Sequence, residues 1–305
     1  MPDLTLGVDL SDHTARLAVV DDSGQAVARA EALPTSGGLV NGVRDAAKRV
    51  LAAAGTTVSA IGVAMPAPGE QLPPEINTVL REVSSRQAEI HPISAGTAAV
   101  LAEQWCGAAR GLKQVIAFSV AEHVTAGVLL NGQPWHGSHG LAGSVAWLAM
   151  NPVEREDYRR FGGLEAEIAS AGMVRRFVWR IKSGDESVVA DRVQGDFSKI
   201  TAEDILQAGR AGDGVSISVV RDTAKYIGMA VANLAIVFDP ETIVLGGMIA
   251  ESGDVMLEAI KVECSRRLPP QQAELLHLVL STLGNDAVAI GAARGASRAG
   301  IHPGA

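Results

Sequence analysis

Acidic and histidine residues gather in two short segments of the sequence, where they could do chemistry. The first segment, Asp9-Leu-Ser-Asp-His-Thr14, follows an apolar stretch typical of a strand, and the second is Ala121-Glu-His123. Carboxylate oxygens and imidazole nitrogens are ligands of Zn²⁺ and Mn²⁺. If the two segments faced each other, they would offer a metal site made of Asp9, Asp12, His13, Glu122 and His123. Surface turns of this composition commonly bind nothing, so the alternative is two solvated turns.

The composition bounds the classes of protein to consider. A chain of 305 residues with 47% hydrophobic residues fits two domains of medium size. No apolar run approaches the roughly 18 residues of a membrane span, and the first residues lack the pattern of a signal peptide. The net charge of −8 disfavours contact with a phosphate backbone. Two cysteines, Cys106 and Cys264, are too few for a disulfide framework. We therefore expect a cytoplasmic protein that binds neither membranes nor nucleic acids.

The hydrophobic pattern predicts an α/β fold. Apolar and alternating stretches predict strands over 4–10, 15–21 and 25–33, followed by a helix over 40–54 and a strand over 58–65. The same order begins again about 110 residues later, with strands over 114–120 and 125–130 and a hairpin turn at Asn131-Gly132. Further helices are expected over 165–182, 201–211 and 213–237, with strands over 243–245 and 276–282 and a last helix from about 286. Thr201, followed three residues later by Asp204, predicts a capping box at the start of the second of these helices.

This repeat predicts two α/β halves, each with the order βββαβα. No Pro- or Ser-rich linker separates them, so the hinge must be short, and we place it near Gly111. The expected domains are residues 1–111 and 112–289. The last helix, about 290–305, is expected to pack back on the first domain.

Motifs along the chain resemble those of the ROK family, the repressor and sugar-kinase group of the actin-like ATPase (ribonuclease H-like) fold. Ile61-Gly-Val-Ala-Met-Pro-Ala-Pro68 is similar to the family's IGVGIPGP, and the segment from Asn131 to Gly143 is similar to NGxxxxGxxGxAG. Matches continue in Phe238-Asp-Pro-Glu-Thr-Ile-Val-Leu-Gly-Gly247 and Ile290-Gly-Ala-Ala293. The resemblance implies two α/β domains with a nucleotide and a sugar meeting in the cleft between them.

The resemblance also implies a catalytic base that this chain lacks. Kinases of the family take the proton of the sugar hydroxyl with the Asp of an Asn-Asp-Ala-Asn run, because an alcohol is a poor nucleophile. The matching stretch here is Ser94-Ala-Gly-Thr97, which puts Ala95 at the position of the base. The nearest ionisable residues in the sequence are His91 and Glu103.

Both phosphate-binding turns of the family have lost glycine here. The family has Asp-Leu-Gly-Gly-Thr where Asp9–Thr14 stands, and Gly-Thr-Gly where Ala121–His123 stands. A carboxylate 4 Å from a phosphate costs about 4 kcal/mol at an effective dielectric constant near 20, so Asp12 and Glu122 oppose ATP binding. Asp9 and the pair Gly246-Gly247 match nucleotide-side positions of the family. Their alternative roles are a strand-end Asp bonded to its own backbone and a simple tight turn.

The sugar-binding and zinc-binding motifs are altered as well. Ser144 and Trp147 replace the Glu and His of the family's Gly-Glu-x-Gly-His segment, and the stretch 156–163 lacks the three cysteines that hold zinc with this His. No structural zinc is therefore expected. Glu165 matches a glutamate of the family's motif. It is a candidate for contact with the sugar, or a cap for the helix it opens. We interpret Trp105, Trp147 and Trp179 as core or interface fillers, and paired arginines such as Arg175-Arg176 as solvated.

These losses favour a catalytically inactive ROK protein, a pseudokinase that binds a small molecule or carbohydrate and acts in regulation or assembly, as a homodimer. The alternative is a carbohydrate kinase that uses ATP and Mg²⁺ and replaces the base with, for example, Glu165 or Glu122. Direct DNA binding is disfavoured, because the family's repressors carry a helix-turn-helix before the first strand and that strand is expected at about Leu4. Regulation through a protein partner is a third hypothesis.

Overall fold

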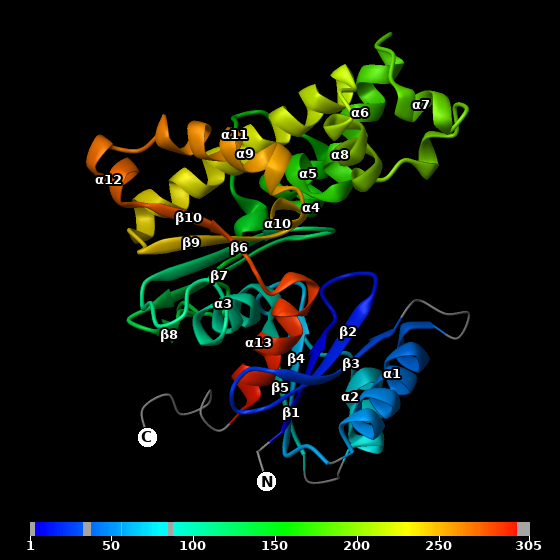
Figure 1. The fold of residues 1–305 in the computed structure, drawn as a ribbon, viewed down its shortest axis with the longest axis vertical. Helices are drawn as coiled ribbons and strands as arrows, with labels where there is room; N and C mark the ends of the chain where they lie inside the picture. The colour runs from blue at the N-terminus through cyan, green and yellow to red at the C-terminus, as the bar shows by residue number, and fades with distance from the viewer. Residues whose placement is uncertain (1–3, 33–37, 56, 85–87, 298–305) are drawn as a thin grey trace. The chain divides into compact units, whose positions relative to one another are not determined.

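The computed structural model describes residues 4–32, 38–55, 57–84 and 88–297 (Figure 1). The chain divides into two compact units, each described by itself. Unit 1 comprises Met1–Phe118, Thr125–Ser144 and Ser281–Ala305, and unit 2 comprises Ser119–Val124 and Val145–Leu280. Every helix within the described residues is too short or too polar to span a lipid bilayer.

The first sheet has five strands in the order β3-β2-β1-β4-β5. Strand β1 (Thr5–Asp9) pairs antiparallel with β2 (Ala15–Val20) and parallel with β4 (Ala60–Met65). Strand β3 (Ala26–Ala32) completes the predicted meander at one edge, and β5 (Glu89–Ser94) forms the other edge. The sequence did not predict β5, because it contains Pro92 and polar residues. An edge position tolerates both.

Helices cover both faces of this sheet. Side chains such as Leu6 and Val8 point into a core with α1 (Gly38–Ala54) and α2 (Pro74–Val83). The opposite face meets α3 (Ala95–Trp105) and α13 (Ala287–Ala296), which pack closely against each other. A β-carbon at Gly7 would lie 1.8 Å from the carbonyl oxygen of Ala289, so glycine is required where α13 crosses β1. The part of the expected last helix beyond residue 297 lies outside the described residues.

The second sheet repeats the topology of the first. Its order is β10-β9-β6-β7-β8, which matches β5-β4-β1-β2-β3 strand for strand. The five strands are β6 (Val115–Val120), β7 (Val124–Leu130), β8 (Gln133–Pro134), β9 (Thr242–Gly247) and β10 (His277–Leu280). Asn131 and Gly132 both have positive φ, 54° and 78°, as the two-residue hairpin turn requires. The predicted two-sheet α/β fold with a duplicated half is therefore confirmed.

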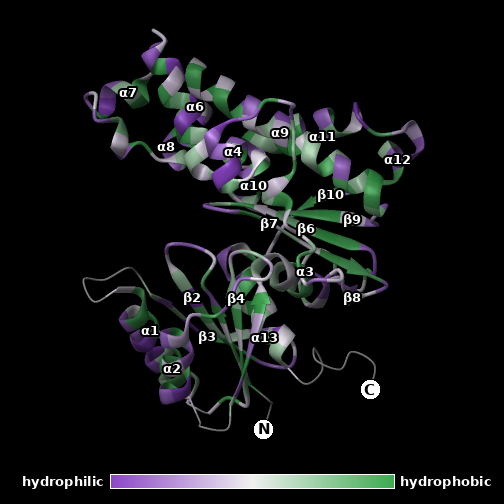
Figure 2. Cartoon of the chain, turned by 180° about the vertical axis from the view of Figure 1, so that it is seen from behind, coloured by the Kyte–Doolittle hydropathy of each residue, from purple (hydrophilic) through white to green (hydrophobic). Residues whose placement is uncertain are grey.

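Unit 2 consists largely of the helices between β8 and β9 and those after β9. Figure 2 shows that β9 and β10 are mainly hydrophobic, whereas α4 is mainly hydrophilic. The capping box predicted at Thr201 and Asp204 is present, and it opens α8. The bounds of these elements are η1 (Val145–Trp147), α4 (Glu156–Phe161), α5 (Gly163–Ile168), α6 (Ser170–Lys182), α7 (Val188–Arg192), α8 (Ala202–Arg210), α9 (Gly214–Phe238), α10 (Met248–Glu251), α11 (Gly253–Ser265) and α12 (Pro270–Leu275).

The single helix expected over 165–182 is wrong, because the chain breaks at Ala169. This residue is extended, with φ −62° and ψ 163°, and it separates α5 from α6. The N–H of Ser170 donates to the carbonyl oxygen of Ala121 at 3.0 Å instead of continuing the helix. Arg175 and Arg176 donate to the carbonyl oxygens of Ala166 and Glu167. Tertiary hydrogen bonds thus satisfy the backbone groups that the break leaves without helical partners.

Candidate ligand-binding site

Asp9 lies at the carboxyl end of β1 and is almost fully buried. Its Oδ1 accepts hydrogen bonds from the backbone N–H of Ser11 at 2.8 Å and from the Ser11 hydroxyl at 2.5 Å. Burial raises the pKa of Asp9, although the bonds from Ser11 and the charge of Arg16 oppose that rise. The carboxylate therefore holds the turn that follows β1.

Asp12 is compensated within its own turn. Its Oδ1 accepts from the N–H of His13 at 2.6 Å, and its Oδ2 accepts from Arg16 at 3.1 Å. Arg16 also approaches Glu31 at 3.6 Å, so its positive charge is shared between two carboxylates. The predicted repulsion between Asp12 and a phosphate is reduced by this ion pair but is not cancelled.

The position of the missing base is a buried helix start. Ser94 ends β5 and caps α3, where its hydroxyl oxygen accepts from the N–H of Thr97 at 3.3 Å. Ala95 is the first residue of α3 and is buried, and the first turn of this helix contains no acidic residue. Glu103, eight residues further along α3, is tied to Ser281 and to the N–H of Ala108. No carboxylate of α3 therefore stands in for the base.

The turn between β6 and β7 is held from inside unit 2. The N–H of Ala121 donates to the carbonyl oxygen of His123 at 3.0 Å, and the carbonyl oxygen of Ala121 accepts from Ser170. The N–H of Val124 donates to Oε2 of Glu165 at 2.9 Å. Two N–H groups of this turn are therefore already engaged and do not point toward a phosphate.

Glu165 and His123 form a pair at the same place. Oε1 of Glu165 lies 3.3 Å from Nδ1 of His123, and the glutamate side chain is only 13% exposed. Glu165 is the acidic residue in the first turn of α5, where the helix dipole favours its charge, as the alternative role at the helix start requires. Glu165 also joins α5 to the turn before β7.

We expect Glu165→Ala to destabilise this turn measurably. The buried N–H of Val124 would lose its acceptor, and an unpaired buried donor costs about 1–3 kcal/mol. Amide hydrogen exchange should show fast exchange of Val124 in Glu165→Ala and protection in the native protein. Glu165→Gln retains a carbonyl acceptor and is the matched control. Equal protection of Val124 in all three proteins would contradict the assignment.

The five residues of the hypothetical metal site belong to separate units. Asp9, Asp12 and His13 are in unit 1, whereas Glu122 and His123 are in unit 2. Among the residues that the structure describes, no three His, Cys, Asp or Glu side chains gather in a way that could hold a metal ion. The metal hypothesis gains no support from these residues.

Gly246 and Gly247 end β9 against the end of β6. A β-carbon at Gly247 would lie 2.2 Å from the carbonyl oxygen of Val120, and Gly247 has φ +61°. A β-carbon at Gly246 would lie 3.1 Å from the Ser119 hydroxyl. Close packing of the two strands is therefore sufficient to explain both glycines.

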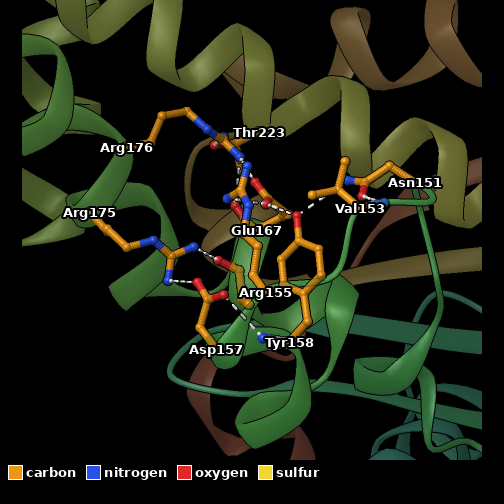
Figure 3. A network of polar contacts seen from close by, with 10 residues as sticks. Asn151, Val153, Arg155, Asp157, Tyr158, Glu167, Arg175, Arg176 and Thr223 are labelled. Atoms are coloured by element: carbon orange, nitrogen blue, oxygen red, sulfur yellow. Dashed lines mark hydrogen bonds and ion pairs between the residues drawn. The ribbon is translucent and has the colours of Figure 1, made fainter.

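A buried polar network surrounds Glu167, two residues after Glu165 on α5 (Figure 3). Its Oε2 accepts from Nη2 of Arg176 at 2.5 Å, and its Oε1 accepts from the Tyr158 hydroxyl and lies 3.2 Å from Arg155. Arg176 also donates to the Thr223 hydroxyl on α9 at 3.0 Å. Burial favours the neutral form of Glu167, but the Tyr158 bond and the bond and charge of Arg176 outweigh it and lower its pKa.

The same network attaches α4, a helix with no buried residue. Asp157 forms an ion pair with Arg175 at 2.8 Å, and Asn151 donates to the Tyr158 hydroxyl at 3.2 Å. Arg175 further donates to the carbonyl oxygen of Ala166 on α5. Polar contacts from α4 and α6 therefore fix the short helix that carries Glu165.

Comparison with known proteins fits this architecture. The sequence profile of the ROK family matches residues 5–298. The chain belongs to the ROK family. The curated relatives include a glucokinase of Halalkalibacterium halodurans, 33% identical over 63% of this chain and 59% of that protein. A xylose repressor of Bacillus spizizenii is 24% identical over 62% of this chain and 45% of that protein. The chain therefore matches less than two thirds of the length of these curated ROK relatives.

Solved ROK structures share the fold over nearly the whole chain. A ROK glucokinase from Streptomyces griseus, in complex with glucose and AMPPNP, has a TM-score of 0.79 at 22% identity and covers 96% of this chain and 99% of its own. A ROK hexokinase from Thermus thermophilus has a TM-score of 0.75 at 25% identity, covering 96% and 98%. These structures show that the chain has the actin-like ROK fold.

The stretch that the ROK resemblance assigns to zinc does not fit that metal. Zinc sites of this type need thiolate or imidazole donors. Residues 156–163 contain neither cysteine nor histidine, and Asp157 and Tyr158 are occupied by Arg175 and Glu167. The ion-pair network connects α4, α5 and α6 in this chain.

One side chain was misjudged from the sequence alone. Arg176 was expected on a solvated face, yet it is mostly buried against Glu167 and Tyr226. The sequence contained no signal for the pairing of Arg176 with Glu167, because nine residues separate them and would place them on opposite faces of the single helix that was expected. Trp147 and Trp179 were interpreted as core or interface fillers, and their exposures of 59% and 67% exclude the core and leave the interface as a prediction.

Proposed function

We propose that this protein is a carbohydrate-binding member of the ROK family that does not transfer phosphate by the family's general-base route. The proposal is carried by the side chain at position 95. Ala95 is buried at the start of α3, has no proton-accepting atom, and is followed by no acidic residue in that turn. Without a base, the sugar hydroxyl stays protonated and attacks a phosphate slowly.

The two turns support the same proposal from the nucleotide side. Asp9 is engaged by Ser11, and Asp12 keeps a carboxylate in the first turn. In the second turn, the N–H of Val124 is taken by Glu165. A triphosphate is bound by several backbone N–H groups that have no other partner and by positive charge. These turns instead present a carboxylate and an N–H group that is already hydrogen-bonded.

A carbohydrate is the ligand class that the relatives favour. The Streptomyces griseus protein was solved with glucose, and the two curated relatives described above are a glucokinase and a xylose repressor. Glu165 provides a carboxylate, 13% exposed, on the sugar side of the family pattern. A carboxylate accepts up to about four hydrogen bonds, so the bonds from unit 2 leave acceptor capacity for a hydroxyl.

A second candidate function is a carbohydrate kinase with a substitute base. The observation that favours it is the 3.3 Å contact between Glu165 and Nδ1 of His123. A glutamate that orients one ring nitrogen sets the tautomer of the imidazole, and the other nitrogen can then accept a proton. In that reaction the sugar oxygen attacks the γ-phosphorus of ATP, its proton passes to His123, and ADP leaves.

One set of measurements separates the two functions. We expect hexoses to raise the melting temperature without nucleotide, since a ligand at 100 times its Kd stabilises the native state by about 2.7 kcal/mol. We expect Mg²⁺-ATP to produce no shift, and no sugar-dependent ADP in a coupled assay. Sugar-dependent ADP that disappears in His123→Ala would overturn the proposal in favour of the kinase. Light scattering of the same samples tests the predicted homodimer.

A further inference from the structure

Two segments connect the first sheet and its helices with the second sheet. The outgoing connection, residues 106–114, leads from α3 to β6, and the returning connection, residues 281–286, leads from β10 to α13. Helices α3 and α13 both pack on the first sheet, so the chain leaves the first half of the fold and returns to it through these two segments. A group that holds both connections would restrain the passage of the chain in both directions.

Glu103, near the end of α3, is bonded to both connections. The residue is only 2% exposed. Its Oε2 accepts a hydrogen bond from the N–H of Ala108 in the outgoing connection at 2.8 Å. Its Oε1 accepts from the hydroxyl of Ser281, the first residue of the returning connection. One buried carboxyl group therefore touches both connections.

The outgoing connection is shaped around this carboxyl group. A β-carbon at Gly107 would lie 2.1 Å from Oε2 and 2.9 Å from Cα of Glu103, so glycine leaves the room in which the side chain folds back over the end of the helix. The N–H groups of Gly107 and Ala109 both donate to the carbonyl oxygen of Glu103 at 3.1 Å. Glu103 thus holds this segment with its side chain and with its backbone.

The returning connection is held through the hydroxyl of Ser281. This hydroxyl donates to Glu103 and accepts from the N–H of Leu283 at 3.3 Å, just before the short helix η3 (Gly284–Asp286). A second contact, the ion pair between Asp286 and Arg29, also holds this connection, but its side chains are 30% and 56% exposed. Exposed ion pairs contribute little to stability, so the buried bond to Glu103 is the stronger restraint.

Burial makes these bonds costly to break. If the carboxyl group moved away, the N–H of Ala108 and the hydroxyl of Ser281 would lose their acceptor in a poorly hydrated place. Burial also raises the pKa of Glu103, while the bonds from Ser281 and Ala108 oppose that rise. The carboxyl group therefore depends on these two partners for its place in the interior.

We propose that Glu103 is a hinge anchor, whose carboxyl group fixes the outgoing and returning connections to each other so that both connections open together. Glu103 is a positioning residue in this role and contacts no ligand. The inference concerns the mechanics of the fold and does not depend on the proposed carbohydrate-binding function.

Hydrogen exchange of the full chain, followed by mass spectrometry on peptides that cover 106–114 and 281–286, tests the anchor. We expect Glu103→Ala to speed exchange of both connections about tenfold or more, because the buried partners lose their acceptor. Glu103→Gln should restore native exchange, since its amide can accept from Ala108 and donate to the oxygen of Ser281. Ser281→Ala should speed exchange of the returning connection alone.

Two control variants separate the anchor from general destabilisation. Leu80 on α2 is fully buried in the core on the other face of the first sheet, so Leu80→Ala weakens unit 1 without touching either connection. Arg29→Ala removes the exposed ion pair of the returning connection. Both variants should change exchange of the two connections by less than about twofold.

Each remaining outcome overturns the anchor. Faster exchange of the outgoing connection alone in Glu103→Ala would mean that the bond to Ser281 restrains nothing. Equal acceleration in Leu80→Ala and Glu103→Ala would mean that the connections open only by unfolding of the whole unit. If Glu103→Ala does not fold, Ser281→Ala decides, and native exchange over 281–286 in that variant contradicts the proposal.

Discussion

Glu167→Ala should lower the free energy of opening of the α4–α6 region by about 3–5 kcal/mol, as expected when one partner of a buried ion pair is removed. Arg176 would keep its charge in a mostly buried position, 16% exposed, with its bond to Thr223 but without its counter-ion. The Tyr158 hydroxyl would lose its acceptor as well. Amide hydrogen exchange over α5 and α6 measures this opening without requiring that the two units unfold together.

An exposed ion pair beside α4 provides the control for this experiment. Glu154 and Arg159 form an ion pair at 3.0 Å in which both side chains are about three-quarters exposed. Exposed pairs contribute about 0–1 kcal/mol, so Glu154→Ala should leave exchange over α5 nearly unchanged. A Glu167→Ala protein whose α5 exchanges like that of Glu154→Ala would show that the network does not fix this helix.

The pH dependence of the same region has a definite sign. The pKa of Glu167 is lower in the folded protein than its ordinary value of 4.5, so its ionised form stabilises the fold. This contribution is fully present above about pH 4.5 and is lost as the pH falls through the lowered folded pKa. Acid titration of hydrogen exchange should therefore destabilise the native α5 region more steeply than that of Glu167→Gln.

The fold was largely predictable because its signals are local and repeated. Alternating apolar residues predicted β1 to β4 and their counterparts β6 and β7, and Thr201 with Asp204 predicted the start of α8. The break at Ala169 was not predictable, since no Pro or Gly marks it. Its backbone groups are satisfied by Ala121, Arg175 and Arg176, which are tertiary contacts.

For the same reason, the sequence predicted which residues belong to the candidate site but not which contacts they make. The family pattern pointed to Glu165 and to the loss of the base at Ala95. It did not indicate that Glu165 bonds Val124 and contacts His123, because that pairing depends on how α5 meets the turn before β7. Trp147 was visible as a replacement for a histidine, but only the structure distinguishes an exposed indole from a core residue.

Gly162→Ala should destabilise the η1–α5 junction by about 3 kcal/mol or more. Gly162 has φ +94° and ψ 150°, a region that is essentially restricted to glycine and costs other residues about 1–3 kcal/mol. The added β-carbon would also meet the backbone oxygen of Ala146 at 2.3 Å, and a backbone atom cannot rotate away as a side chain can. The chain must therefore shift, and Trp147 shifts with it.

Gly184→Ala separates the backbone contribution from the clash. Gly184 has φ +106° in the same unit, but nothing lies within 4 Å of the β-carbon that alanine would add. Gly184→Ala should therefore lose only the backbone part of the stability, about 1–2 kcal/mol. Gly162→Ala should lose this part and, in addition, the part that comes from the clash with Ala146, as measured by hydrogen exchange. Equal losses of stability in the two variants would mean that the close contact between η1 and Gly162 does not contribute.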